Sequence, residues 1–84
     1  MERAEHRVRL RAFLDGIRRP EKPLDTLGDR DPLVTSGLID SLAILELIAY
    51  LEAEVGIDFS QSGVQPEDLR SVSAILDLIE RQGQ

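Results

Sequence analysis

The sequence predicts an all-α protein: a small four-helix bundle with three main helices, one short helix and a long loop between the first two main helices. Apolar residues recur with the 3.6-residue period of a helix over residues 2–18, 41–55 and 72–82. No segment has the alternating pattern that is typical of a strand. The length of 84 residues predicts one small domain, residues 1–84. Because the chain contains no cysteine, we expect no disulfide and no thiolate metal site.

The charge of the chain is acidic overall but unevenly distributed. The net charge is −6, yet residues 1–22 hold seven basic and four acidic side chains, whereas residues 23–84 hold three basic and twelve acidic ones. An acidic body disfavours binding to nucleic acid and favours partners with basic docking faces. No apolar stretch approaches the roughly 18 residues of a membrane span, and the N-terminus lacks the apolar block of a signal peptide. We therefore expect a cytoplasmic protein without membrane contact.

The first helix is expected over residues 2–18. It should end where Arg19 precedes Pro20, because the residue before a proline is driven out of the α region. Its core-facing stripe consists of Leu10, Phe13, Leu14 and Ile17, with Val8 beside it. His6 lies near the N-terminus and is expected to be an ordinary surface residue.

Residues 20–39 form the predicted long loop, which contains three prolines and two glycines. Apolar residues recur along it and should hold it against the core: Leu24, Leu27, Leu33, Val34 and Leu38. A short helical turn can form within it. Asp25, Asp29 and Asp31 also lie here, but they lack the ligand order and the distal glutamate of an EF-hand, so we predict no metal site.

The central helix, residues 41–55, has more apolar residues than a surface helix needs. One line of them should face the core: Ile44, Leu47, Ile48, Leu51 and Val55. A second line is displaced around the helix: Leu42, Leu45 and Ala49. Two explanations remain open, because this second line could pack under the long loop or stay exposed for a partner. Gly56 should end the helix.

Two further helices are predicted after the central one. Pro66, followed by two acids, indicates a short helix at residues 66–69. Ser71 is a suitable N-cap for the last helix, residues 72–82. The apolar stripe of that helix consists of Val72, Ile75, Leu76 and Ile79.

Ser41 is the most distinctive polar residue, because it opens the central helix directly after Asp40. The chain has one histidine, His6, and it has no glycine-rich phosphate loop, HExxH pair or Cys/His ligand set. We therefore predict no catalytic residue and no enzyme activity, and any chemistry at Ser41 would need a separate enzyme. A helix N-terminus favours an attached phosphate by about 0.3–1 kcal/mol. Asp40 can cap the same helix, and an ordinary helix start would also explain both residues.

The segment Gly37-Leu38-Ile39-Asp40-Ser41-Leu42 resembles the phosphopantetheine attachment motif of acyl and peptidyl carrier proteins. The resemblance continues through Glu46-Leu47 and Leu51-Glu52 to Phe59, then to the short helix and Ser71-Val72. It covers residues 8–82. The tripeptide Asp-Ser-Leu alone is uninformative, but its place after a proline-containing loop and before an acidic amphipathic helix is specific.

The resemblance implies a stand-alone, monomeric carrier of acyl or aminoacyl groups. Ser41 would receive 4′-phosphopantetheine from coenzyme A through a magnesium-dependent phosphopantetheinyl transferase, and Asp40 would help to hold the magnesium and the transferase. The thiol of the arm would carry cargo as a thioester between a loading ligase or acyltransferase and downstream synthase enzymes. The resemblance also implies a partner-binding surface, which consists of Leu42, Leu45, Glu46, Ala49 and Glu52.

The chain departs from the fatty-acid carriers at two positions of the motif. Those carriers typically read Ala-Asp-Ser-Leu-Asp, whereas Ile39 and Ala43 occupy the first and last positions here. The departures favour a carrier for amino acids or specialised metabolites over a housekeeping fatty-acid carrier. Two alternative functions belong to other classes of protein. One is a helical adaptor of the same fold that is never modified, and the other is a small hydrolase that pairs Ser41 with His6.

Overall fold

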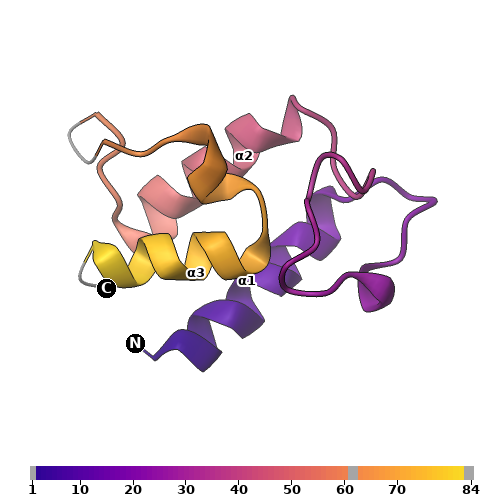
Figure 1. Cartoon of the computed structure of the whole chain (residues 1–84), viewed down its shortest axis with the longest axis horizontal. Coiled ribbons are helices and arrows are strands. Elements are labelled where there is room, and N and C mark those ends of the chain that lie inside the picture. Colours follow the sequence, from indigo (N-terminus) through magenta and orange to yellow (C-terminus); the bar gives the residue numbers. More distant parts are fainter. Residues whose placement is uncertain (1, 61–62, 83–84) are drawn as a thin grey trace.

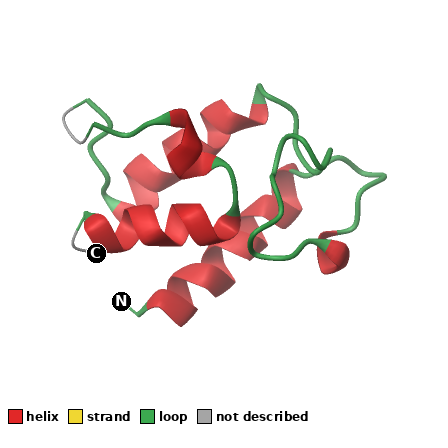
Figure 2. Ribbon diagram, in the orientation of Figure 1, coloured by secondary structure: helices red, strands yellow, loops and turns green. Residues whose placement is uncertain are grey.

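The computed structural model describes residues 2–60 and 63–82. Within these residues the chain is all-helical and contains no strand, which confirms the all-α part of the predicted fold class (Figure 2). The elements in chain order are α1 (Arg3–Ile17), the 3₁₀ segment η1 (Leu24–Thr26), α2 (Ala43–Tyr50), the π-helical segment η2 (Leu51–Val55), the 3₁₀ segment η3 (Pro66–Leu69) and α3 (Val72–Arg81). Of the described helices, none combines the length and the apolar character that crossing a membrane requires.

The helices α1 and α3 pack together near the two ends of the chain, as Figure 1 shows. Arg3 in the first turn of α1 reaches α3, where its Nη1 lies 3.0 Å from Asp77 Oδ1 and 2.9 Å from Glu80 Oε1. The helix α2 lies on the other side of α3, and the connection from α1 to α2 extends away from the three helices (Figure 1). The start of α2 is therefore placed near this connection rather than near the chain ends.

The core is built from all three helices and from the connection between α1 and α2. Its fully buried side chains come from α1 (Leu10, Leu14), the connection (Leu33, Ile39), α2 and η2 (Leu47, Leu51) and α3 (Val72, Ile75, Leu76, Leu78, Ile79). Burial of large aliphatic side chains of this kind supplies most of the driving force for folding. The predicted stripes thus do supply the core, although Phe13, Ile17, Ile44 and Ile48 are only partly buried.

The connection between α1 and α2 is held to the core by side chains and by backbone bonds. Leu27, Leu33 and Leu38 are buried as predicted, whereas Val34 is 42% exposed and does not act as an anchor. The Leu33 N–H donates to the Arg70 carbonyl at 2.8 Å, next to the start of α3. η1 supplies the short helical turn that was expected within this segment.

The central helix differs from its prediction at both ends. The α-helix begins at Ala43 instead of residue 41, and after Tyr50 the chain widens into the π-helical η2. The π-type bond from Gly56 N–H to the Leu51 carbonyl, 2.9 Å, closes this segment. Gly56 then adopts φ +86°, a left-handed conformation that favours glycine, and ends the helix as predicted.

His6 is buried, so its predicted surface position is wrong. Only 7% of the residue is exposed, and Nε2 has no hydrogen-bond partner among the described residues. The first turn of α1 packs near the end of η2, where His6 shares a hollow with Tyr50 and Val55. Burial, which disfavours the charged imidazolium, lowers the pKa of His6 below its ordinary value.

Candidate functional site

Ser41 lies in a short exposed turn that is anchored on both sides. Leu38 and Ile39 before it are buried, Asp40, Ser41 and Leu42 are exposed, and Ala43 after it is buried again. A turn precedes these residues, in which the Gly37 N–H donates to the Val34 carbonyl at 3.0 Å and Gly37 adopts φ +87°, a conformation that favours glycine. The anchors hold the serine at the surface, so its position does not depend on a flexible loop.

Asp40 caps the start of α2. Its Oδ1 accepts from the Ala43 N–H at 2.9 Å, and its carbonyl accepts from the same N–H at 3.2 Å. The bond from Leu45 N–H to the Leu42 carbonyl, 3.1 Å, continues this tight first turn. Ser41 therefore precedes the first regular turn of α2, close to the positive end of the helix dipole, although it stands two residues before the α-helix begins.

The second apolar line of the central helix does not pack under the connection. Leu42 is 73% exposed and Leu45 is 66% exposed, and Ala49 is exposed as well. Glu46 and Glu52 are exposed at positions that continue the same helical spacing. The face defined by Leu42, Leu45, Glu46, Ala49 and Glu52, here called the α2 face, is thus apolar along its centre and acidic beside it. A monomer rarely leaves adjacent leucines this exposed without a use for them.

An apolar hollow lies beside the first turn of α2, where Ile44 lines it three residues after Ser41, and the sequence did not reveal it. Its volume is about 270 Å³, and its lining comes from the connection (Pro32, Val34, Thr35), α2 (Ile44) and the η3 region (Pro66, Leu69, Arg70). Val34 and Ile44 were expected to be core residues, but both keep exposed surface because they line this hollow. The one available signal was the surplus of apolar residues in the loop.

His6 is not positioned to activate Ser41. It lies beside Tyr50 and Val55, at the opposite end of the α2–η2 helix from the serine. At about 1.5 Å of rise per residue, the α-helix from Ala43 to Tyr50 alone spans roughly 10 Å, and Val55 lies further along in η2. A general base must come within hydrogen-bond reach of its nucleophile, so these two side chains do not form the pair that a hydrolase would need.

Two aspartates of the connection, Asp29 and Asp31, have structural partners. Asp29 accepts from Arg7 Nε at 2.7 Å and from Arg11 Nη1 at 3.1 Å, and these arginines lower the pKa of its carboxyl. Asp31 Oδ2 accepts from the Gly28 N–H at 2.8 Å. Across residues 2–60 and 63–82, no three His, Asp or Glu side chains converge as a metal ion would require.

Comparison of the chain with protein-family models, with curated proteins and with solved structures found no match. A functional assignment therefore rests on the motif around Ser41 and on its geometry. That geometry consists of an exposed hydroxyl on a fixed turn, the capping carboxylate of Asp40, the α2 face and the adjacent apolar hollow.

Proposed function

We propose that the chain is a stand-alone acyl carrier protein. It would be modified with 4′-phosphopantetheine on Ser41 and would carry acyl or aminoacyl cargo as a thioester between partner enzymes. The observation that carries the proposal is the exposed Ser41, held on a capped turn beside the exposed Leu42 and Leu45. In this proposal α1, α2 with η2, and α3 are the main helices of a four-helix bundle, η3 is the short one, and residues 18–42 are the long loop.

The modification would be a phosphoryl-type transfer to the serine hydroxyl. Ser41 Oγ would bond to the phosphorus that carries the pantetheine arm, adenosine 3′,5′-bisphosphate would leave, and the serine proton would pass to a base of the transferase. The exposure of Ser41 supports this reaction because a second protein must reach the hydroxyl. Asp40 uses Oδ1 for its capping bond, which leaves Oδ2 for the transferase and its magnesium.

The α2 face would be the docking surface for the transferase, for a loading ligase or acyltransferase, and for downstream synthases. Leu42, Leu45 and Ala49 would fill apolar depressions on these enzymes, and Glu46 and Glu52 would pair with basic residues around them. Ala43 is buried, so position 43 contributes to the core and offers no acid for docking. This supports the preference for amino-acid or specialised-metabolite pathways over fatty-acid synthesis, in a cytoplasmic and monomeric carrier.

The direct test is enzymatic labelling with coenzyme A and a promiscuous phosphopantetheinyl transferase, read by intact mass. The wild-type protein should gain the mass of one arm, Ser41→Ala should gain none, and Ser60→Ala should label like the wild type because Ser60 is an exposed serine outside the motif. An unlabelled wild-type protein, in a reaction that modifies a known carrier, would rule the proposal out. Labelling of Ser41→Ala would mean that the arm is attached to another residue.

An unmodified helical adaptor is the second candidate, because the exposed Leu42 and Leu45 would serve binding alone equally well. The two functions differ in what Ser41 contributes. In a strain that depends on this protein, Ser41→Ala should abolish the function of a carrier and should leave the function of an adaptor intact. Leu45→Glu should damage both, because it puts a charge on the shared docking face.

A further inference from the structure

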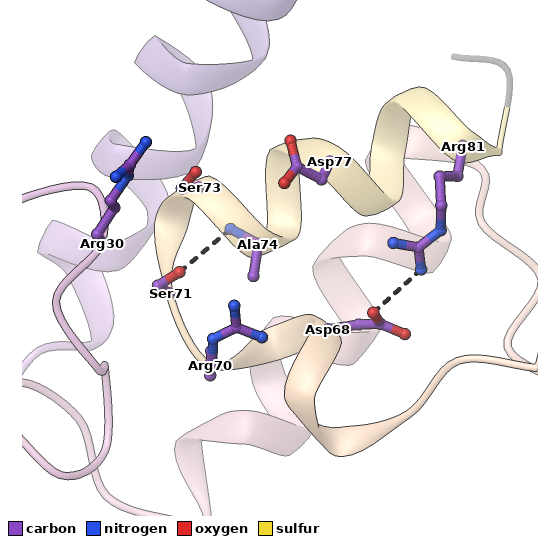
Figure 3. A pocket seen from close by; sticks show the side chains of 8 residues that line it. All are labelled: Arg30, Asp68, Arg70, Ser71, Ser73, Ala74, Asp77 and Arg81. Atoms are coloured by element: carbon purple, nitrogen blue, oxygen red, sulfur yellow. Dashed lines mark hydrogen bonds and ion pairs between the residues drawn. The ribbon is translucent and has the colours of Figure 1, made fainter.

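A polar hollow, larger than the apolar one that Ile44 lines, lies beside α3, and Ser41 does not line it. Its volume is about 460 Å³. Figure 3 shows its lining residues, which come from the connection, from the η3 region and from α3: Arg30, Asp68, Arg70, Ser71, Ser73, Ala74, Asp77 and Arg81. Three arginines on one hollow are notable in a chain whose net charge is −6.

Both carboxylates of the hollow have an arginine partner. Asp68 Oδ1 lies 3.0 Å from Arg81 Nη2, and its Oδ2 accepts from the Gln65 N–H at 2.9 Å. These bonds, first the one from Gln65 and then the one from Arg81, lower the pKa of Asp68 and keep it ionised. Asp77 pairs with Arg3 at 3.0 Å. Arg81 therefore balances Asp68, whereas Asp77 is balanced only in part, because Arg3 also pairs with Glu80 at 2.9 Å.

The charges of Arg30 and Arg70 are not balanced in this way. Neither guanidinium forms an ion pair with a carboxylate of residues 2–60 or 63–82. Within the described part of the chain, Arg70 Nη1 donates to the Glu67 carbonyl at 3.0 Å, which orients the side chain without neutralising it. Counted with the four arginines and three carboxylates at the hollow and in its ion pairs, the net charge is about +1, and Arg30 and Arg70 are its unpaired positive groups.

Two backbone bonds bring Arg30 and Arg70 to the same hollow. The Ser73 N–H donates to the Asp29 carbonyl at 2.8 Å, and the Leu33 N–H donates to the Arg70 carbonyl at 2.8 Å. The segment that carries Arg30 is therefore fixed to the start of α3 on both sides of that arginine. Figure 3 places Arg30 beside Ser73, and Arg70 between η3 and α3.

We propose that this hollow binds a small molecule with a phosphomonoester group, held between Arg30 and Arg70 with the Ser73 hydroxyl beside it. Two guanidinium groups match the charge of a phosphate dianion and its several acceptor oxygens. The hollow has the size of a small-molecule site, so it also accommodates an organic group along α3. Its concave form favours a small ligand over an acidic protein segment.

The side chains, and not the helix N-terminus, would hold this anion. The first amides of α3 are already used, since the Ser73 N–H donates to Asp29 and the Ala74 N–H donates to Ser71 Oγ at 3.1 Å. Ser71 is consequently a structural residue of the site wall. The site is also independent of the proposed carrier function, because no residue of the α2 face lines it.

The test is an NMR titration of the protein with phenyl phosphate and with benzoate, at constant ionic strength. Phenyl phosphate should give saturable shifts of the amides of Ser71, Ser73 and Ala74, and benzoate should bind at least about tenfold more weakly because it is a monoanion. The double variant Arg30→Gln/Arg70→Gln should lose at least about tenfold in affinity for phenyl phosphate. The matched control Arg9→Gln/Arg19→Gln removes the same net charge elsewhere and should bind like the wild type.

Three results would overturn the proposal. One is a phenyl phosphate response that does not saturate. Another is an equal loss of affinity in the two double variants, which would mean that only the overall charge matters. The third is a polyglutamate peptide that binds at these amides more tightly than phenyl phosphate, which would assign the hollow to protein docking. Circular dichroism of each variant checks that the fold is intact.

Discussion

The helices α2 and α3 are both rich in apolar residues, but they use them differently. Every apolar side chain of α3 is buried: Val72, Ala74, Ile75, Leu76, Leu78 and Ile79. In α2 the buried residues are Ala43 and Leu47, while Leu45 is 66% exposed and Leu42, just before the helix, is 73% exposed. The core thus accounts for all the apolar residues of α3 and for only some of those of α2.

Apolar content alone therefore does not tell which helix is structural. A helix at the surface needs one apolar stripe, and α3 has just that. The additional leucines, Leu45 in α2 and Leu42 just before it, face solvent next to Ser41. There they lower solubility and do not stabilise the core. We attribute them to binding, and the predictions below test whether the two helices differ in the way this requires.

The largest expected effect separates a leucine of α3 from a leucine of α2. Leu78→Ala should lower the free energy of unfolding by about 2–5 kcal/mol, because Leu78 is fully buried and its loss leaves a cavity. Leu45→Ala should change it by less than about 0.5 kcal/mol. Urea unfolding followed by circular dichroism measures both. A loss in Leu45→Ala comparable to that in Leu78→Ala would mean that the α2 face is part of the core.

A smaller effect distinguishes the two helix starts. Ser71→Ala should destabilise the protein by about 1 kcal/mol, because it removes the buried Oγ that accepts from the Ala74 N–H at 3.1 Å. Asp40→Ala removes a similar bond at 2.9 Å, but Asp40 is exposed and water can replace its oxygen, so the loss should be smaller. Thermal unfolding of both variants ranks them, and the reverse order would contradict a structural role for Ser71 and a mainly functional one for Asp40.

The smallest effect concerns the pH dependence of stability at the far end of the α2–η2 helix. The pKa of His6 is lowered in the folded state, so below about pH 6.5 the unfolded chain binds a proton that the folded chain does not. Stability should therefore fall as the pH drops from about 6.5 toward the lowered pKa. His6→Gln, which cannot titrate, should lose this slope, whereas a slope equal to that of the wild type would place its origin elsewhere. Asp29 and Asp68 also have lowered pKa values, but their protonation changes the stability only below about pH 4.

The sequence was sufficient for the features that depend on local periodicity and local caps. Spacing and residue type predict the apolar stripes of α1 and α3, the capping bonds of Asp40 and Ser71, and the end of the central helix at Gly56. The sequence also distinguishes the two apolar lines of the central helix, but it does not tell which line is buried and which stays exposed. Spacing tells which residues share a face, and only the tertiary packing tells which face is covered.

The features that the sequence did not reveal depend on contacts between distant segments. His6 is buried because the first turn of α1 meets the end of η2, some fifty residues later in the chain. The hollow with Arg30 and Arg70 exists because two backbone bonds join the connection to the start of α3. Val34 stays exposed because the connection leaves a hollow over Ile44 instead of closing it.

We propose that Ser41, beside the exposed leucines at the start of α2, is a site of covalent attachment. The most direct measurement is intact mass spectrometry of the protein purified from its own cells, followed by fragmentation of the peptide that contains residue 41. The predicted result is a mass above that of the chain by one phosphopantetheine, alone or with a thioester-bound group, and located on Ser41. A protein that carries only the mass of its sequence, or a modification on another residue, would contradict the claim.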